Sequence, residues 1–182
     1  MARILTRGGA ASGVVLDSGE EIRARAVVSA VDPHRTFFGL VGEEDLDAEF
    51  ASSVRRFKMR GSSGKVNLAL DGLPEFACLP GDGPHLRGDI TIAPSVDYLE
   101  RAYDDWKNGI WSQDPYIDML IPSLTDPTMT PPGKHFMSVF VQYVPPKVNG
   151  QDWTDDQVQA FGQTVVNQID EYAPGFKDLI LH

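Results

Sequence analysis

Cysteine is almost absent from this sequence of 182 residues, since Cys78 stands alone and no disulfide can form within the chain. Such a composition is typical of proteins from a reducing compartment. No second metal ligand lies near Cys78 at the spacing of a zinc site. We therefore expect Cys78 to be a small buried or half-buried apolar side chain.

Positive charge is also scarce. Lys and Arg together number 16 against 26 for Asp and Glu, which gives a net charge of −10. Nucleic-acid binding requires clustered basic side chains. The longest basic cluster is Arg55, Arg56, Lys58 and Arg60, and its spacing is typical of a solvated helix face. The sequence therefore predicts no nucleic-acid partner.

Long apolar runs are missing as well. No stretch approaches the roughly 20 apolar residues that cross a bilayer, so we expect no transmembrane segment. The first residues, Met1-Ala2-Arg3-Ile4, lack the apolar region of a signal peptide. Together these features predict a cytoplasmic or membrane-peripheral protein.

Recognised catalytic motifs are the last absence. The sequence has no GxGxxG loop after a strand, which would bind a dinucleotide, and no GxSxG nucleophile turn. Its histidines are scattered without zinc-ligand spacing: His34, His85, His135 and His182. Neighbouring carboxylates lie at helix starts, where acidic residues favour the helix dipole, or on polar helix faces, and a solvated surface explains them better than acid–base catalysis. We expect neither a metal site nor a catalytic residue in this chain.

Strand and turn signals dominate residues 3–31. Glycines supply two tight turns, at Gly8-Gly9 and near Gly19. This pattern of strands and turns predicts a β-meander. Residues 27–31 are apolar except for one serine, which predicts a strand covered on both faces. Asp32-Pro33 then has the pattern of a helix start.

The rest of the chain alternates helices and strands. Helices are predicted over 46–58, from Ser95 to Asn108, and from a Thr154/Gln157 capping box to Pro174. The last helix should turn these side chains inward: Val158, Phe161, Val165, Ile169 and Tyr172. Strands are predicted over 65–71, 89–93, 116–121 and 136–143. The fold class is therefore α+β, a mixed or antiparallel sheet with helices on one face, preceded by the β-meander.

Aromatic side chains gather in the second half of the chain. In strand 136–143, Phe136, Ser138 and Phe140 share one face, while Met137, Val139 and Val141 share the other. Val66, Leu68 and Leu70 form one apolar face of an earlier strand. Core packing explains such faces, and so does an apolar wall that contacts a substrate. Both readings stay open at this point.

Several of these segments together resemble a known family. They are the hairpin Gly13-Val14-Val15-Leu16-Asp17-Ser18-Gly19, the run Val27-Val28-Ser29-Ala30, the helix start Asp32-Pro33 and the later Pro131-Pro132-Gly133-Lys134-His135. In these the chain resembles FAD-dependent oxidoreductases of the phytoene-dehydrogenase-like and amine-oxidase superfamily. The resemblance extends to the branch with pyridine-nucleotide-disulphide oxidoreductase domain-containing proteins.

The resemblance implies that the chain is an internal fragment. Residues 1–33 would be the β-meander and return strand of the FAD-binding domain. Residues 34–182 would be the substrate-binding α+β domain, incomplete at its C-terminus. In the intact enzyme FAD would accept a hydride from an apolar or amine-like small molecule.

The same resemblance puts four positions near the dinucleotide: Ala2, Arg3, Ser29 and Ala30. The fragment itself lacks the glycine-rich βαβ unit, so we expect it to bind no FAD and to be inactive alone. Exposed N-terminal strands would favour a homo-oligomer. The alternative is a non-catalytic binding or interaction module with an apolar pocket.

Overall fold

The structure is a computed structural model that describes all 182 residues. The chain forms two compact units, Met1–Met59 and Arg60–His182. Each has its own antiparallel sheet, which confirms the α+β class and the leading β-meander. The boundary expected after residue 33 lies inside the first unit, and the assignment of residues 1–33 to a cofactor domain stays a prediction. No helix is both long and apolar enough to span a membrane.

The first unit begins with the predicted meander, in which β1 (Arg3–Arg7), β2 (Ala10–Val15) and β3 (Glu21–Arg23) pair in sequence order. Gly8 and Gly9 adopt positive φ angles of 59° and 77° at the first turn. That conformation favours glycine, which has no β carbon to clash there.

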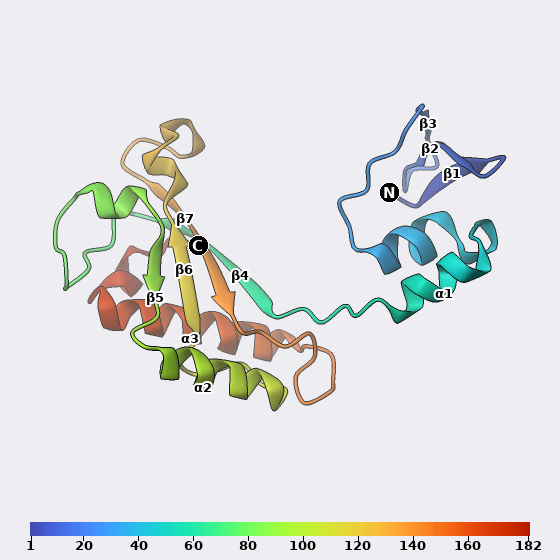
Figure 1. Ribbon diagram of the computed structural model, residues 1–182. Helices are drawn as coiled ribbons and strands as arrows, with labels where there is room; N and C mark the ends of the chain where they lie inside the picture. The colour runs from blue at the N-terminus through green and yellow to red at the C-terminus, as the bar shows by residue number, and fades with distance from the viewer. The chain divides into compact units, whose positions relative to one another are not determined.

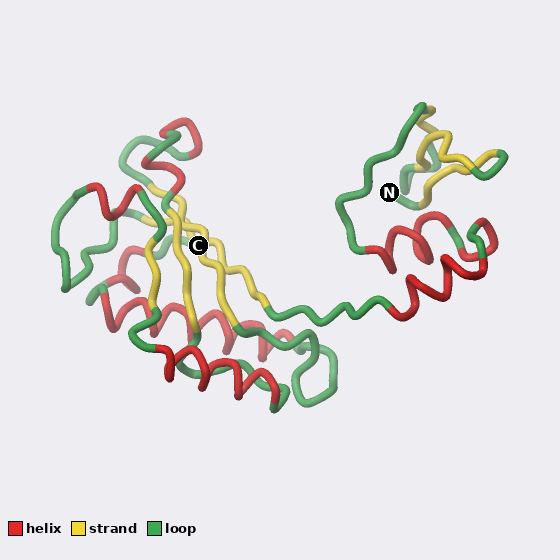
Figure 2. The backbone as a smooth tube through the Cα atoms, in the orientation of Figure 1, coloured by secondary structure: helices red, strands yellow, loops and turns green.

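The strand expected over residues 27–31 does not form, and this part of the prediction is wrong. The segment between β3 and the next helix is a loop (Figure 2), and Val28 is 95% exposed. A strand needs a neighbour that takes up its backbone N–H and C=O groups. No other strand of the chain pairs with this segment. Its apolar pattern alone is therefore not enough to form a strand.

Helices complete the first unit. They are the short helix η1 (Arg35–Val41), the single turn η2 (Glu43–Asp45) and α1 (Ala48–Arg56). The Asp32 carboxylate accepts the N–H of Arg35 at 2.9 Å, as expected of a residue at a helix start. Asp47 caps α1 in the same way, by accepting the N–H groups of Glu49 and Phe50.

The second unit contains a four-stranded sheet in the order β4-β7-β6-β5. Its strands are β4 (Ser63–Leu70), β5 (Ile90–Ile92), β6 (Tyr116–Leu120) and β7 (His135–Gln142). All neighbours are antiparallel. The four predicted strands are therefore confirmed to within a few residues.

One face of this sheet is covered by α3 (Asp155–Tyr172), which runs across the strands (Figure 1). The core lies between them and contains these fully buried residues: Leu70, Ile117, Met119, Met137, Val139, Val141, Val165 and Ile169. The Thr154/Gln157 capping box is present as predicted. Val158 is 50% exposed, contrary to prediction, because it lies in the first turn of α3, where the helix faces solvent.

The second helix of this unit, α2 (Val96–Lys107), lies beside the end of the sheet where β6 starts (Figure 1). Ser95 caps it by accepting the N–H of Tyr98 at 3.1 Å. The Tyr98 hydroxyl donates to the Pro115 carbonyl at 2.7 Å, just before β6. This buried bond fixes α2 against the residues just before β6.

Candidate functional site

The candidate site is the face of the four-stranded sheet that points away from α3, which we call the open face. Alternation along the strands assigns its side chains, and all are exposed or half-buried: Lys65, Asn67, Ala69, Thr91, Tyr116, Asp118, Leu120, Phe136, Ser138, Phe140 and Gln142. The predicted division of β7 is confirmed, because Met137, Val139 and Val141 are fully buried on the other face.

Three apolar side chains form the centre of the open face. Leu120 of β6 pairs with Ser138 of β7, so Phe136 and Phe140 are its two diagonal neighbours. Diagonal neighbours on one face lie about 7–8 Å apart, within reach of aromatic rings. Leu120 is 46% exposed and Phe140 36% exposed. The cluster therefore presents apolar surface for contact with another molecule.

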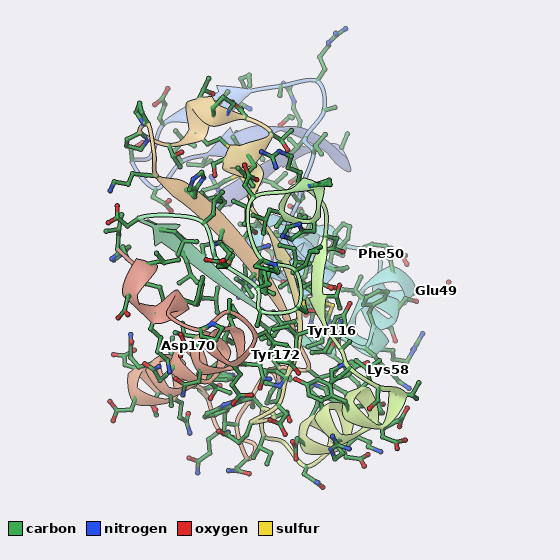
Figure 3. All side chains as sticks on the ribbon, turned by 90° about the vertical axis from the view of Figure 1, so that its left-hand side faces the viewer. Glu49, Phe50, Lys58, Tyr116, Asp170 and Tyr172 are labelled. Carbon is green, nitrogen blue, oxygen red and sulfur yellow. The ribbon has the colours of Figure 1, made fainter.

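A polar network borders this cluster. The Asp118 carboxylate accepts hydrogen bonds from the Thr91 hydroxyl at 2.6 Å and from the Tyr116 hydroxyl at 2.5 Å. Tyr116 is labelled on β6 in Figure 3. Asp118 pairs directly with Phe140, and Phe140 with Lys65 on its other side. The apolar centre thus has a carboxylate on one side and an ammonium on the other.

The Asp118 carboxylate also changes the pKa of Tyr116. Its hydrogen bond from the phenol, with partial burial, raises the pKa of Tyr116 to about 12. Tyr116 therefore remains protonated near neutral pH and acts as a hydrogen-bond donor, not as a base. A carboxylate offers about four acceptor positions, so Asp118 keeps some for a ligand. Its charge suits a ligand that carries an amine.

The four positions expected near a dinucleotide differ in their surroundings. Ala2, Arg3 and Ala30 are exposed, and the Ala2 N–H is taken up by the Val15 carbonyl at 2.8 Å. The Ser29 hydroxyl lies 2.7 Å from that of Thr36. Ser29 also lines a cavity of about 410 Å³ with these residues: Ile4, Ala11, Val27, Val31, Pro33, Thr36, Phe37 and Val41.

These positions do not form a cradle for a pyrophosphate. Such cradles use free N–H groups of a glycine-rich loop at a helix start, and η1 starts in the non-glycine sequence Pro33-His34-Arg35. The Ala2 N–H and the Ser29 hydroxyl already have partners within the chain. The residues present do not fit the FAD pyrophosphate by themselves, and a contact of these four residues with a dinucleotide stays a prediction.

A second apolar cavity, of about 340 Å³, lies between β5 and the loop before it. Its walls come mainly from Phe76, Leu79, Ile90, Ile92 and Tyr172, the last of these in the final turn of α3 (Figure 3). Cys78 lines it too and is exposed, so the expectation of a buried or half-buried thiol is wrong. Phe76 alone anchors this part of the loop in the core, and Leu79 remains 53% exposed.

A serine and a histidine meet elsewhere in the second unit, a pair that sequence spacing did not suggest. The Ser123 hydroxyl lies 3.2 Å from Nδ1 of His135 and also accepts the Phe136 N–H at 3.2 Å. Ser123 is 5% exposed, and no carboxylate is hydrogen-bonded to His135. The pair therefore joins the turn after β6 to the start of β7 and is not arranged as a nucleophile and base.

The comparisons with known proteins give relatives for nearly the whole chain. It is 37% identical over 180 residues to pyridine nucleotide-disulfide oxidoreductase domain-containing protein 2 of Mus musculus. The corresponding protein of Rattus norvegicus is 36% identical. The alignments cover 95% of this chain, which spans only 31% of the length of these relatives. The resemblance to this group of oxidoreductases is thus confirmed.

The chain was also compared with protein-family models and with solved structures. No family model matches the chain. The crystal structure of an oxidoreductase from Methanosarcina mazei aligns with a TM-score of 0.44 and 16% identity over 96% of this chain and 33% of the other.

Proposed function

We propose that this chain is the substrate-binding part of an FAD-dependent oxidoreductase, with its open face as a wall of the substrate site. The single observation that carries the proposal is the partly exposed cluster of Leu120, Phe136 and Phe140 beside the Asp118 network. The kinship with proteins named as oxidoreductases supports it. Residues 1–33 would belong to the FAD-binding domain of the intact protein.

The kinship with proteins named as oxidoreductases supports an oxidation as the reaction. We propose a desaturase-like or dehydrogenase-like oxidation, in which bound FAD would supply the hydride acceptor. The groups that cradle the FAD pyrophosphate would come from residues outside this chain, because the N-terminal positions offer no such cradle. The open face would hold and orient the substrate and exclude water from it. The intact protein would act in the cytoplasm or at a membrane surface.

The open face also suggests the kind of substrate. Leu120 and the two phenylalanines would bury an apolar body, and the Asp118 carboxylate would pair with an amine at one end. Octylamine and octanol are suitable probes, because they share an alkyl chain and differ in charge. Both should shift the amide signals of β6 and β7 residues on the open face. Octylamine should bind more tightly, and Asp118→Asn should remove that difference.

A chimera tests the oxidoreductase assignment. The matching third of the mouse relative is replaced by this chain, and visible flavin absorbance is measured after purification. We expect the folded chimera to retain flavin and the isolated chain to retain none. Stoichiometric FAD binding by the isolated chain would contradict the division of labour proposed here. Loss of flavin from a chimera that is folded by circular dichroism would contradict the assignment.

A second candidate function is a non-catalytic binding module, and the cavity beside β5 favours it. This cavity is within the size range of small-molecule sites and is mainly apolar. If the chain acts in this way, octanol should shift the signals of Phe76, Ile90 and Ile92 and leave the open face unchanged. That result, together with a flavin-free folded chimera, would favour the binding module.

A further inference from the structure

The apolar cluster of the open face borders a hollow beyond the end of β6. Leu120, the last residue of β6, belongs to this cluster and also lines the hollow, which has a volume of about 310 Å³. The other lining residues come from the loop before β5 and from the segment after β6: Arg87, Gly88, Ile121, Pro122, Thr125, Asp126 and Met129. That second segment lies at the end of the sheet where β6 stops (Figure 1). Leu120 therefore joins the open face to the hollow.

Met129 supplies a flexible apolar side chain to the hollow. It is the last residue of the short helix η5 (Pro127–Met129) and is 50% exposed. Asp126 fixes the start of η5, because its carboxylate accepts the Thr128 N–H at 3.0 Å and the Thr128 hydroxyl at 2.6 Å. A thioether side chain adapts readily to apolar ligands of irregular shape. The backbone thus holds Met129 at the hollow, while its side chain can adjust to a ligand.

The charged groups at the hollow are already engaged within the chain. The Arg87 guanidinium donates to the two carboxylate oxygens of Asp82 at 2.7 Å and 3.3 Å. Asp126 has no ion pair, but the two hydrogen bonds from Thr128 take up its Oδ1 atom. The remaining walls are mainly apolar, from Leu120 and Met129 together with Ile121 and Pro122. The hollow therefore favours an uncharged end of a ligand over a charged one.

Spacing along β6 indicates the length of such a ligand. Asp118 and Leu120 are two residues apart on the same face of the strand, a separation of about 7 Å. An extended chain advances about 1.2 Å per bond, because an extended residue covers its length with three bonds. An amine held at Asp118 therefore needs roughly six bonds to reach Leu120. Further methylenes of the same chain would enter the hollow.

We propose that the hollow beyond Leu120 binds the far end of a long-chain primary amine whose ammonium group is held by Asp118. This inference rests on the proposed function of the open face and specifies the substrate as an amine with more than about six carbons in its chain. Leu120 and Phe136 contact the near part of the chain, and Met129 contacts its end. Met129 is then a residue that determines the preferred chain length.

The test compares hexylamine with dodecylamine, below its micelle concentration, on the whole chain labelled with ¹³C in the methionine methyl groups. Both amines should shift the amides of β6 and β7 on the open face, and only dodecylamine should shift the Met129 methyl signal. Dodecylamine should bind roughly tenfold more tightly or better, because each fully buried methylene contributes about fourfold in affinity. Met59, which is 42% exposed in the first unit, is the internal control and should not shift.

Met129→Lys places an ammonium group at the hollow and should remove the preference for dodecylamine, while hexylamine binding stays. Met59→Lys makes the same change at another exposed methionine and should keep the preference. Dodecanediamine has the length of dodecylamine but carries a second charge at its far end. It should bind about as weakly as hexylamine, because the apolar walls do not compensate for a desolvated charge.

Three results would overturn the proposal. Equal affinity for hexylamine and dodecylamine, both lowered by Asp118→Asn, would remove the hollow as a binding site and leave the open face in place. Failure of both amines to bind would overturn the hollow together with the proposed function of the open face. Equal shifts of Met59 and Met129, or tighter binding of dodecanediamine than of dodecylamine, would show that the hollow does not select an apolar chain end.

Discussion

Gly64 of β4 lies directly against the ring of Phe161 of α3. A β carbon placed on Gly64 would be 2.8 Å from Cζ of Phe161 and 2.8 Å from Cγ2 of Val144. Real β carbons do not approach other atoms so closely, so this position requires glycine for space. The contact limits how near α3 can come to β4 at this position.

Gly64→Ala should therefore destabilise the chain by about 1–3 kcal/mol, the usual cost of an overpacked core. The measurement is urea unfolding followed by circular dichroism. Phe161→Leu should recover part of the loss in the double variant, because it removes one of the two clashing groups. Gly61→Ala is the matched control, since nothing lies within 4 Å of a β carbon there. Equal stability of both alanine variants would contradict the close contact.

Leu68→Asp should prevent stable folding. Leu68 is 6% exposed on the α3 side of β4, and a carboxylate there would lack a partner. Burying it costs several kcal/mol, which is comparable with the total stability of a domain. Asn67→Asp, one residue away on the open face, should change the melting temperature little. If Leu68→Asp melts like the parent chain, the assignment of the two faces is wrong.

The elements of the second unit could be predicted because local signals agreed with packing. Alternation in residues 66–70 and 136–143 and the caps at Ser95 and Thr154 need no knowledge of distant residues. Residues 27–31 show the opposite case. Their apolar run satisfies the pattern of a buried strand, but strand formation depends on a neighbour that the local sequence cannot reveal.

Asp118→Asn should lower the pKa of Tyr116 from about 12 toward the ordinary value of about 10. The reason is that the amide no longer offers a negative charge to the phenol. The tyrosine Cζ chemical shift, followed against pH and assigned with Tyr116→Phe, measures the change. Thr91→Val removes the other hydrogen bond of Asp118 and should leave the Tyr116 titration nearly unchanged. An unaltered titration in Asp118→Asn would show that the carboxylate does not bind the phenol.

The candidate site could be predicted only in part, for a related reason. The shared face of Phe136 and Phe140 follows from period two within one strand. The network of Thr91, Tyr116 and Asp118 depends on which strands are neighbours and in what register. Strand order β4-β7-β6-β5 does not follow from chain order, so no local pattern could bring Thr91 to Asp118.

Stability should fall with acidity because of His135. Burial lowers its pKa below the usual value of about 6.5, although Asp82 acts in the opposite direction. The folded chain then binds this proton less readily than the unfolded chain. The stability linked to His135 is complete above about pH 6.5 and is lost as the pH falls below that value.

The measurement is the urea midpoint at about pH 7.5 and at about pH 5.5, on either side of the usual histidine pKa. His135→Gln should reduce the difference between the two midpoints. His182→Gln, at an exposed position, should leave it unchanged. If His135→Gln keeps the full pH dependence, the loss of stability in acid arises from other groups.

The first unit should associate with other copies of itself. Apolar side chains lie exposed on it, with Val28 95%, Val31 47% and Ile22 of the edge strand β3 45% exposed. Exposed strand edges and grouped apolar residues favour pairing between chains. Size-exclusion chromatography with light scattering should show a concentration-dependent dimer, and an apolar dye should bind to the chain at low concentration.

The double variant Ile22→Thr with Val28→Thr should shift the equilibrium between monomer and dimer toward the monomer. Val96→Thr, at a 72% exposed position in the second unit, should leave the equilibrium unchanged. A monomer at all concentrations without dye binding would contradict the prediction, because the exposed valines would then have no measurable effect on association.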